Sequence, residues 1–282
     1  MSTSAELERR PSGLTDDPIL RGALRLLQPA LGYRFNLDAL LLAHFAAAAL
    51  SEPPTLLIDL GAGCGVVGLL LARRWTRCRA RLIERQSALA QLAAQNVTRN
   101  GLAARVRVFS GDLRRVALWR PRATTRRVLV VCNPPFFSLA RGRCSPNRTV
   151  AEAKHELTCT LAELLDASAR GLRPGDALAL IHLATRREEL LRLLGEHGLA
   201  PQRQRLVLPA PGREATRVLL LARRLADRAR GEGAAKTVPC AGSSEDPPLV
   251  VHCAPGVYSA ELRQLLGDEQ TVPPGPPRAR KL

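Results

Sequence analysis

Short apolar segments that alternate with helical segments constrain the fold of this chain of 282 residues more than any other feature. Each apolar segment is bounded by turn residues, and several are apolar throughout, which is typical of strands covered on both faces. The expected strands are 56–60, 80–84, 105–109, 127–132, 176–183, 204–208 and 216–222. The expected helices are 39–50, 65–74, 86–99, 157–170 and 186–197.

Strands separated by helices predict an α/β fold, because right-handed crossovers place such strands side by side with helices on both faces. A short connection at 209–215 joins the last two expected strands, which favours an antiparallel hairpin at the sheet edge. We therefore expect a seven-stranded, mostly parallel, Rossmann-like sheet with a reversed last strand.

Changes in composition mark the expected limits of this domain. Residues 1–18 are polar and are expected to fray, and the linker is rich in Gly, Ala, Ser and charge. The expected parts are an N-terminal lid segment near the substrate at 1–50, a core domain at 51–225, a linker at 226–247, a small strand–helix appendage at 248–268 and a disordered tail at 269–282.

The chain is strongly basic. It has 42 Lys and Arg against 25 Asp and Glu, which gives a formal net charge of +17. Such a charge attracts polyanions such as RNA through phosphate neutralisation and counterion release. The alternative is a generally arginine-rich surface that has no polyanionic partner.

Cysteine usage and hydropathy restrict the compartment and exclude several classes of protein. The seven cysteines are odd in number and form no C-x-x-C pair, which argues for reduced thiols and against a disulfide framework or a metal site. No apolar run approaches the length of a membrane span, and the first residues lack the apolar core of a signal peptide. We expect a cytoplasmic protein without metal or membrane partners.

An amide followed by two prolines ends the expected strand 127–132. Pro134 and Pro135 cannot donate to a strand ladder, so the sheet stops there and Asn133 lies at the carboxyl end of the strand. Asn133 Oδ1 and the Pro134 carbonyl can each accept one N–H of a planar amino group, while Phe136 stacks on the attached ring. The structural alternative is a proline-terminated strand with core phenylalanines.

A glycine-rich segment ends the first expected core strand. Gly61, Gly63 and Gly65 allow a tight turn and a close approach of a ligand to the backbone. Asp59 is placed to contact the ammonium group of a cofactor. A dinucleotide fingerprint would require glycine at Val66, so the spacing disfavours NAD. A tight turn without a ligand is the alternative.

Acidic residues also follow the next two expected strands. Glu84 can accept hydrogen bonds from both hydroxyls of a ribose, and Asp112 can accept one from an adenine amino group. Ligands of open α/β sheets bind at the carboxyl ends of the strands, which favours these roles. The alternatives are an ion pair of Glu84 with Arg81 or Arg85, and an ordinary turn at Asp112.

Together these motifs resemble the Rossmann-like S-adenosylmethionine-dependent methyltransferases of the Asn-Pro-Pro-aromatic class. Within that class, the chain is most similar to the bacterial tRNA1(Val) (adenine-N6)-methyltransferases, from about residue 32 to residue 267. The segments that carry the resemblance are 32–43, 59–65, 133–136, 145–148, 153–156 and 249–261. Phe136 stands where the best-known members have tyrosine, and the linker and basic tail are a further departure.

The resemblance implies methylation of the N6 amino group of an adenosine in a tRNA anticodon loop, by a monomer or weak dimer that uses S-adenosylmethionine. The implied catalytic residues are Asn133, Pro134, Pro135 and Phe136. The implied cofactor-binding residues are Asp59, Gly61, Gly63, Gly65, Glu84 and Asp112. Candidate RNA-binding residues are Arg34, Asp38, Arg141, Arg143, Arg148 and His155.

Other substrates fit the same amide motif. Glutamine-N5 methylation of a release factor presents a similar NH2 group but gives no reason for the basic charge. Guanine-N2 methylation of ribosomal RNA and methylation of DNA adenine are closer alternatives, which nucleoside analysis separates. A protein that keeps this fold and binds RNA without turnover is the non-enzymatic alternative.

Overall fold

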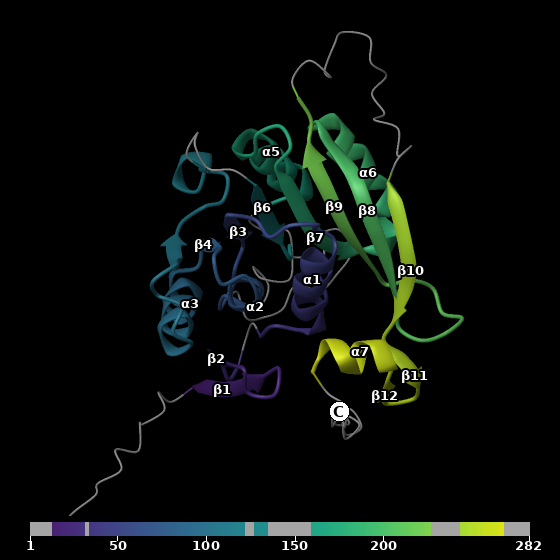
Figure 1. The fold of residues 1–282 in the computed structure, drawn as a ribbon, viewed down its shortest axis with the longest axis horizontal. Coiled ribbons are helices and arrows are strands. Elements are labelled where there is room, and N and C mark those ends of the chain that lie inside the picture. The colour runs from purple at the N-terminus through teal and green to yellow at the C-terminus, as the bar shows by residue number, and fades with distance from the viewer. Residues whose placement is uncertain (1–12, 32–33, 122–126, 135–158, 227–242, 268–282) are drawn as a thin grey trace, which may run out of the picture.

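The computed structural model describes residues 13–31, 34–121, 127–134, 159–226 and 243–267. An eight-stranded sheet forms its centre, in the order β10-β8-β9-β7-β6-β3-β4-β5 (Figure 1). Its strands are β3 (Leu56–Leu60), β4 (Arg79–Glu84), β5 (Val106–Ser110), β6 (Val128–Cys132), β7 (Ala177–Leu183), β8 (Leu199–Leu208), β9 (Arg217–Arg224) and β10 (Ser244–Val250).

Helices cover both faces of the sheet, as expected. Successive side chains of a strand point to opposite faces, and the buried residues accordingly form two clusters. Leu57 and Leu129 pack with α1 (Leu37–Ala48), α2 (Val66–Arg74) and α3 (Ser87–Arg99). Ile58 and Val130 pack with the 3-10 helix η1 (Val116–Leu118), α5 (Leu161–Gly171) and α6 (Arg187–Glu196). A second 3-10 helix, η3 (Ala184–Arg186), precedes α6.

The mostly parallel sheet with a reversed strand is confirmed, although the reversed strand lies inside the sheet. β9 is antiparallel to both β7 and β8, and β10 pairs with the outer side of β8. The hairpin was therefore wrongly expected at the edge. β8 also begins at Leu199 rather than at 204, because Pro201 lies at a register shift where a missing N–H is tolerated.

The strand order places a switch point between β3 and β6. From β3 the chain continues outward to β4 and β5, whereas β6 and β7 extend the sheet in the other direction. Leu60 and Cys132 are register partners at the ends of β3 and β6. The residues that follow them, Gly61 and Asn133, therefore leave the sheet side by side.

An N-terminal hairpin of β1 (Leu14–Ile19) and β2 (Leu24–Pro29) corrects the expectation that residues 14–18 fray. Leu24 and Leu26 are fully buried against the core. An asparagine of α3 and the asparagine that caps its C-terminus also bind the backbone of β2 on its open edge. Asn96 pairs with the N–H and carbonyl of Leu27, and Asn100 with those of Arg25.

The C-terminal segment extends the sheet. β10 begins at Ser244, so the last residues of the stretch expected as a linker pair with β8. The expected strand–helix arrangement is present, with an additional hairpin of β11 (His252–Ala254) and β12 (Val257–Tyr258) before α7 (Ala260–Leu265). Most of the linker and the whole tail lie outside the described residues. Within the described residues, no helix has the length and apolar character needed to cross a membrane.

Candidate active site

A pocket at the carboxyl edge of the sheet brings three sequence segments together. Its lining comes from the segment before α1, the glycine loop with the start of α2, and the residue after β6. The lining residues are Phe35, Ala39, Asp59, Gly61, Ala62, Cys64, Val66, Val67 and Asn133. The switch point thus places the Asn133 amide in the same pocket as the glycine loop.

The glycine loop adopts a backbone conformation that other residues rarely reach. The φ angles of Gly61, Gly63 and Gly65 are 73°, 57° and 93°, in the left-handed region that glycine populates at little cost. A Cβ at Gly65 would also lie 3.0 Å from Leu82 Cδ2. The loop therefore turns tightly into α2. Gly61 is exposed and lines the pocket, whereas Gly63 and Gly65 are buried and are not among its lining residues.

Asp59 is a buried carboxyl group of this pocket. Its Oδ2 accepts a hydrogen bond of 2.8 Å from the backbone N–H of Gly68, and its side chain is almost completely buried. Burial raises the pKa of Asp59 to about 7, and the nearby charge of Glu84 acts in the same direction. A ligand with a positive charge would favour the ionised form of this group.

Gly68 is a functional residue that the sequence reasoning missed. A Cβ at this position would lie 2.9 Å from Leu82 Cδ1 and 3.1 Å from Asp59 Oδ2. A larger residue here would require the side chain of Leu82 or Asp59 to shift, so glycine favours the close approach of α2 to β3 and the bond to Asp59. A glycine inside a helical segment was the signal, because glycine is unfavourable in a helix interior and its presence there indicates close packing.

Glu84 holds the glycine loop against the end of β4. Its Oε2 accepts from the N–H of Gly63 at 2.9 Å, and its Oε1 accepts from the N–H of Gln86 at 2.7 Å. Burial raises the pKa of Glu84, and these amides oppose that shift. The carboxylate therefore faces the loop at the position expected for a contact with the ribose.

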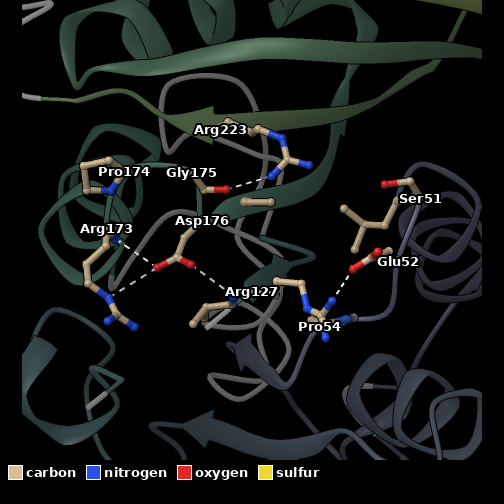
Figure 2. A pocket seen from close by; sticks show the side chains of 12 residues that line it. Ser51, Glu52, Pro54, Arg127, Arg173, Pro174, Gly175, Asp176 and Arg223 are labelled. Carbon is tan, nitrogen blue, oxygen red and sulfur yellow. Dashed lines mark hydrogen bonds and ion pairs between the residues drawn. The ribbon is translucent and has the colours of Figure 1, made fainter. Parts of the chain in front are cut away.

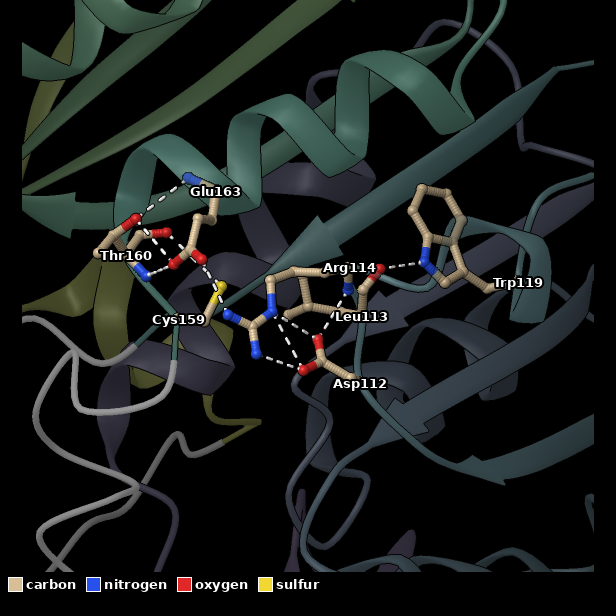
Figure 3. Close-up of polar contacts among 7 residues, drawn as sticks. All are labelled: Asp112, Leu113, Arg114, Trp119, Cys159, Thr160 and Glu163. Atoms are coloured by element: carbon tan, nitrogen blue, oxygen red, sulfur yellow. Dashed lines mark hydrogen bonds and ion pairs between the residues drawn. The ribbon is translucent and has the colours of Figure 1, made fainter.

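Asp112 belongs to an ion-pair network that Figure 3 shows. Arg114 Nη2 lies 2.5 Å from Asp112 Oδ2, and Arg114 Nη1 lies 2.8 Å from Glu163 Oε1. The hydrogen bonds from Arg114 are the main reason that the pKa of Asp112 is lowered. Glu163 also completes a capping box with Thr160 at the start of α5. The network thus joins the exit of β5 to α5.

The other candidate residues lie around the pocket or outside the described part of the chain. Arg34 binds Asp17 and Thr15 of the N-terminal hairpin, and buried Asp38 accepts from Arg217 Nε at 3.2 Å. Pro134 is described, directly after Asn133. The residues outside the described part are Pro135, Phe136, Arg141, Arg143, Arg148 and His155.

Asn96 is a second residue that the sequence reasoning missed. It is completely buried, and its Nδ2 donates to the carbonyls of Leu27 and Cys64 at 3.0 and 2.9 Å. One side chain of α3 therefore connects the N-terminal hairpin to the glycine loop. An asparagine in the middle of a helix was the signal, since a buried amide needs polar partners.

The fold and the pocket together define a Rossmann-like methyltransferase. The positive-φ loop and the buried carboxylates of Asp59 and Glu84 fit a ligand that carries cationic and hydroxyl groups, as S-adenosylmethionine does. Asn133 lines the same pocket.

Comparisons with known proteins agree with this class. The family model described as the methyltransferase small domain matches residues 38–183. A tRNA1(Val) (adenine(37)-N6)-methyltransferase of Porphyromonas gingivalis is 30% identical over 239 residues, which cover 84% of this chain and 89% of that protein. A protein of the same name from Aeromonas salmonicida is 28% identical, over 81% of this chain and 86% of its own.

A solved structure shows the same fold. A protein named as a predicted O-methyltransferase from Agrobacterium tumefaciens superposes with a TM-score of 0.58 at 21% identity, over 81% of this chain and 94% of its own. The chain belongs to the methyltransferase small-domain family and, within it, to the family of tRNA1(Val) (adenine-N6)-methyltransferases. It is an enzyme whose methyl donor is S-adenosylmethionine.

Proposed function

We propose that this enzyme methylates the N6 amino group of an adenosine in a tRNA anticodon loop. The observation that carries the proposal is the position of Asn133, which follows β6 at the switch point and lines one pocket with Asp59 and Gly61. The names of the relatives support tRNA adenine as the substrate, and the net charge of +17 suits an RNA partner.

Asn133 and Pro134 align the amino group for the reaction. Asn133 Oδ1 accepts one N–H of the amine and the Pro134 carbonyl accepts the other, which directs the nitrogen lone pair toward the methyl group. S-adenosylmethionine supplies a methyl group on positively charged sulfur, which is electrophilic without further activation. The aligned nitrogen would take up this methyl group and would then lose a proton to water.

The remaining residues hold the cofactor. We assign the ammonium group of S-adenosylmethionine to Asp59, directly or through water, and the ribose hydroxyls to Glu84. The backbone of Gly61, Gly63 and Gly65 forms the floor beside them. Asp112 accepts a hydrogen bond from the adenine amino group of the cofactor. One of the hydrogen bonds from Arg114 to this carboxylate is released first.

Phe136 stacks on the substrate base in this proposal, and the arginines at 141, 143 and 148, with His155, contact the RNA. Arg34 and Asp38 contribute from the lid segment. In this proposal the enzyme acts in the cytoplasm, where tRNA is available, as a monomer or weak dimer.

Transfer of radiolabelled methyl groups tests the proposal. The purified enzyme is incubated with labelled S-adenosylmethionine and either unmodified tRNA, ribosomal RNA or a release factor, and labelled RNA is digested to nucleosides. We expect the label in N6-methyladenosine from tRNA. Label in N2-methylguanosine, or in glutamine of the protein, would instead support one of the alternative methyltransferase activities.

A further inference from the structure

A groove lined by five arginines lies at the amino ends of β3, β4 and β5. Asn133 lies at the opposite, carboxyl ends of the strands. The arginines are Arg77, Arg79, Arg81, Arg105 and Arg107. No acidic residue is among the described residues that line this groove. It is therefore a concentrated positive surface outside the catalytic pocket.

Four of these arginines form a two-by-two array on one face of the sheet. Arg81 and Arg107 are register partners, and Arg105 O accepts the backbone N–H of Ala80, next to Arg79. Side chains two residues apart on a strand share a face. Like charges on neighbouring strands repel each other, so binding of an anion to the array would be favourable.

Helix packing leaves this part of the sheet face open within the described residues. The described part of the connection between β5 and β6 contains only the short helix η1, and α3 packs on the opposite face of β5. Arg79 and Arg107 are exposed on this face.

Backbone carbonyl groups hold two arginines of the array in place. Arg81 Nη1 donates to the carbonyls of Trp119 and Arg120 at 2.9 and 3.0 Å, and Arg105 Nη1 donates to two carbonyls near the start of β4. Carbonyl oxygens orient a guanidinium group but carry no net charge. The guanidinium groups of Arg79 and Arg107 make no ion pair with another described residue.

A second arginine-containing groove at the same edge differs in this respect (Figure 2). There, Arg127 pairs with Glu52, Arg173 with Asp176, and Arg223 donates to the carbonyl of Gly175. Asp176 also accepts the backbone N–H of Val128. These bonds join the starts of β6 and β7. The second groove therefore has a structural role, and most of its positive charge is paired.

We propose that the array of Arg79, Arg81, Arg105 and Arg107 binds backbone phosphates of the same RNA whose base enters the catalytic pocket. This inference rests on the proposed function. The planar guanidinium group suits phosphate, because it forms paired charge-assisted hydrogen bonds. A strand of the length of β4 spans about 20 Å at roughly 3.3 Å per residue, so only an RNA longer than a short stem-loop is expected to reach from the catalytic pocket to the array.

The test is the double variant Arg79→Gln/Arg107→Gln, which leaves the structural bonds of Arg81 and Arg105 intact. For full-length tRNA we expect KM to rise about tenfold at constant kcat, and the slope of log affinity against log salt to fall in magnitude by about 1 to 2. Affinity for S-adenosylmethionine, and KM for a stem-loop of about four base pairs, are expected to stay at the wild-type values.

The matched control is Arg170→Gln/Arg192→Gln, which removes the same charge from exposed positions on α5 and α6. The proposal would be overturned if the groove variant and the wild type had the same tRNA affinity and the same salt slope. It would also be overturned if the control variant lost as much tRNA affinity as the groove variant, or if the groove variant lost as much affinity for the short stem-loop as for full-length tRNA. Binding is measured with S-adenosylhomocysteine present, so it does not depend on turnover. If the groove variant loses tRNA affinity while the wild type methylates no RNA, binding of RNA phosphates by the groove is supported, and the proposed function and its link to the groove fail.

Discussion

We expect the buried carboxyl group of Asp59, which we assign to the ammonium group of S-adenosylmethionine, to make cofactor binding sensitive to pH. Its pKa is about 7, because the side chain is buried among apolar residues and lies near Glu84. A cationic ligand favours the ionised form, so below that pKa the binding of S-adenosylmethionine must first release a proton. The affinity for S-adenosylmethionine is therefore expected to fall at acidic pH and to reach its full value above the pKa of Asp59.

We predict that the affinity of the wild-type enzyme for S-adenosylmethionine rises by up to about tenfold per pH unit between about pH 5.5 and 7, and then levels off. Calorimetry across this range measures the effect. Asp59→Asn is the control, because it keeps an acceptor for the Gly68 N–H but cannot titrate, and it also reports any titration of the ligand. A wild-type profile parallel to that of Asp59→Asn would rule out this role.

At the scale of elements, side chains of α3 attach the N-terminal hairpin to the site. Asn96 binds both polar backbone groups of Leu27 in β2 and the carbonyl of Cys64 in the glycine loop. A buried amide with all these bonds stabilises the fold, because removal leaves several buried backbone groups without partners. The hydrogen bonds of Asn96 therefore connect the N-terminal hairpin to the glycine loop.

We predict that Asn96→Ala lowers the free energy of unfolding by about 2 to 4 kcal/mol, since several buried groups lose their partners. Equilibrium unfolding in urea measures the change. Gln95→Ala is the matched control, because Gln95 is the exposed neighbour on the same helix and is expected to change stability by less than about 0.5 kcal/mol. Equal stability of the two variants would contradict the structural role of Asn96.

Arg114 is a second link between elements, from the exit of β5 to α5. It lowers the pKa of Asp112 and contributes to the lowered pKa of Glu163. Groups with lowered pKa values stabilise the fold above the pKa of the unfolded state, and this stabilisation disappears as the pH falls through the folded values. The link therefore acts at neutral pH and is lost in acid.

Replacing Arg114 with alanine is expected to lower the free energy of unfolding by about 1 kcal/mol at neutral pH, because this partly exposed ion pair is screened by solvent. The difference from the wild type is expected to shrink at acidic pH. Arg115→Ala, at the exposed adjacent position, is the control. Thermal unfolding at several pH values tests this, and a difference that does not depend on pH would be inconsistent with it.

At the scale of the whole molecule, the parallel sheet and the position of its site could be predicted from the sequence. Apolar strands with polar residues at their ends identify the sheet, and the switch point then brings the end of β3 next to the end of β6. Gly61 and Asn133, far apart in the sequence, are placed together by this rule alone.

Features that depend on distant partners could not be predicted. The hairpin of β1 and β2 has polar residues at Thr15, Asp16 and Asp17, and it is held by side chains of α3 rather than by its own pattern. The first half of β8 could not be predicted, because proline usually ends a strand. Pro201 is tolerated there because it lies at a register shift in the pairing of β8 with β9. The Asp112 network needs Glu163 on a helix much later in the sequence.

The central claim is that the carboxamide of Asn133 aligns the amino group for methyl transfer, and single-turnover kinetics of Asn133→Ala test it most directly. With saturating tRNA and labelled S-adenosylmethionine, we predict a rate lower by about 100- to 1,000-fold, as for other positioned polar groups at reaction centres. The affinity for S-adenosylmethionine is expected to change by less than about twofold, because the residues assigned to hold it are unaltered. A variant that transfers the methyl group at a rate close to that of the wild type would contradict the account.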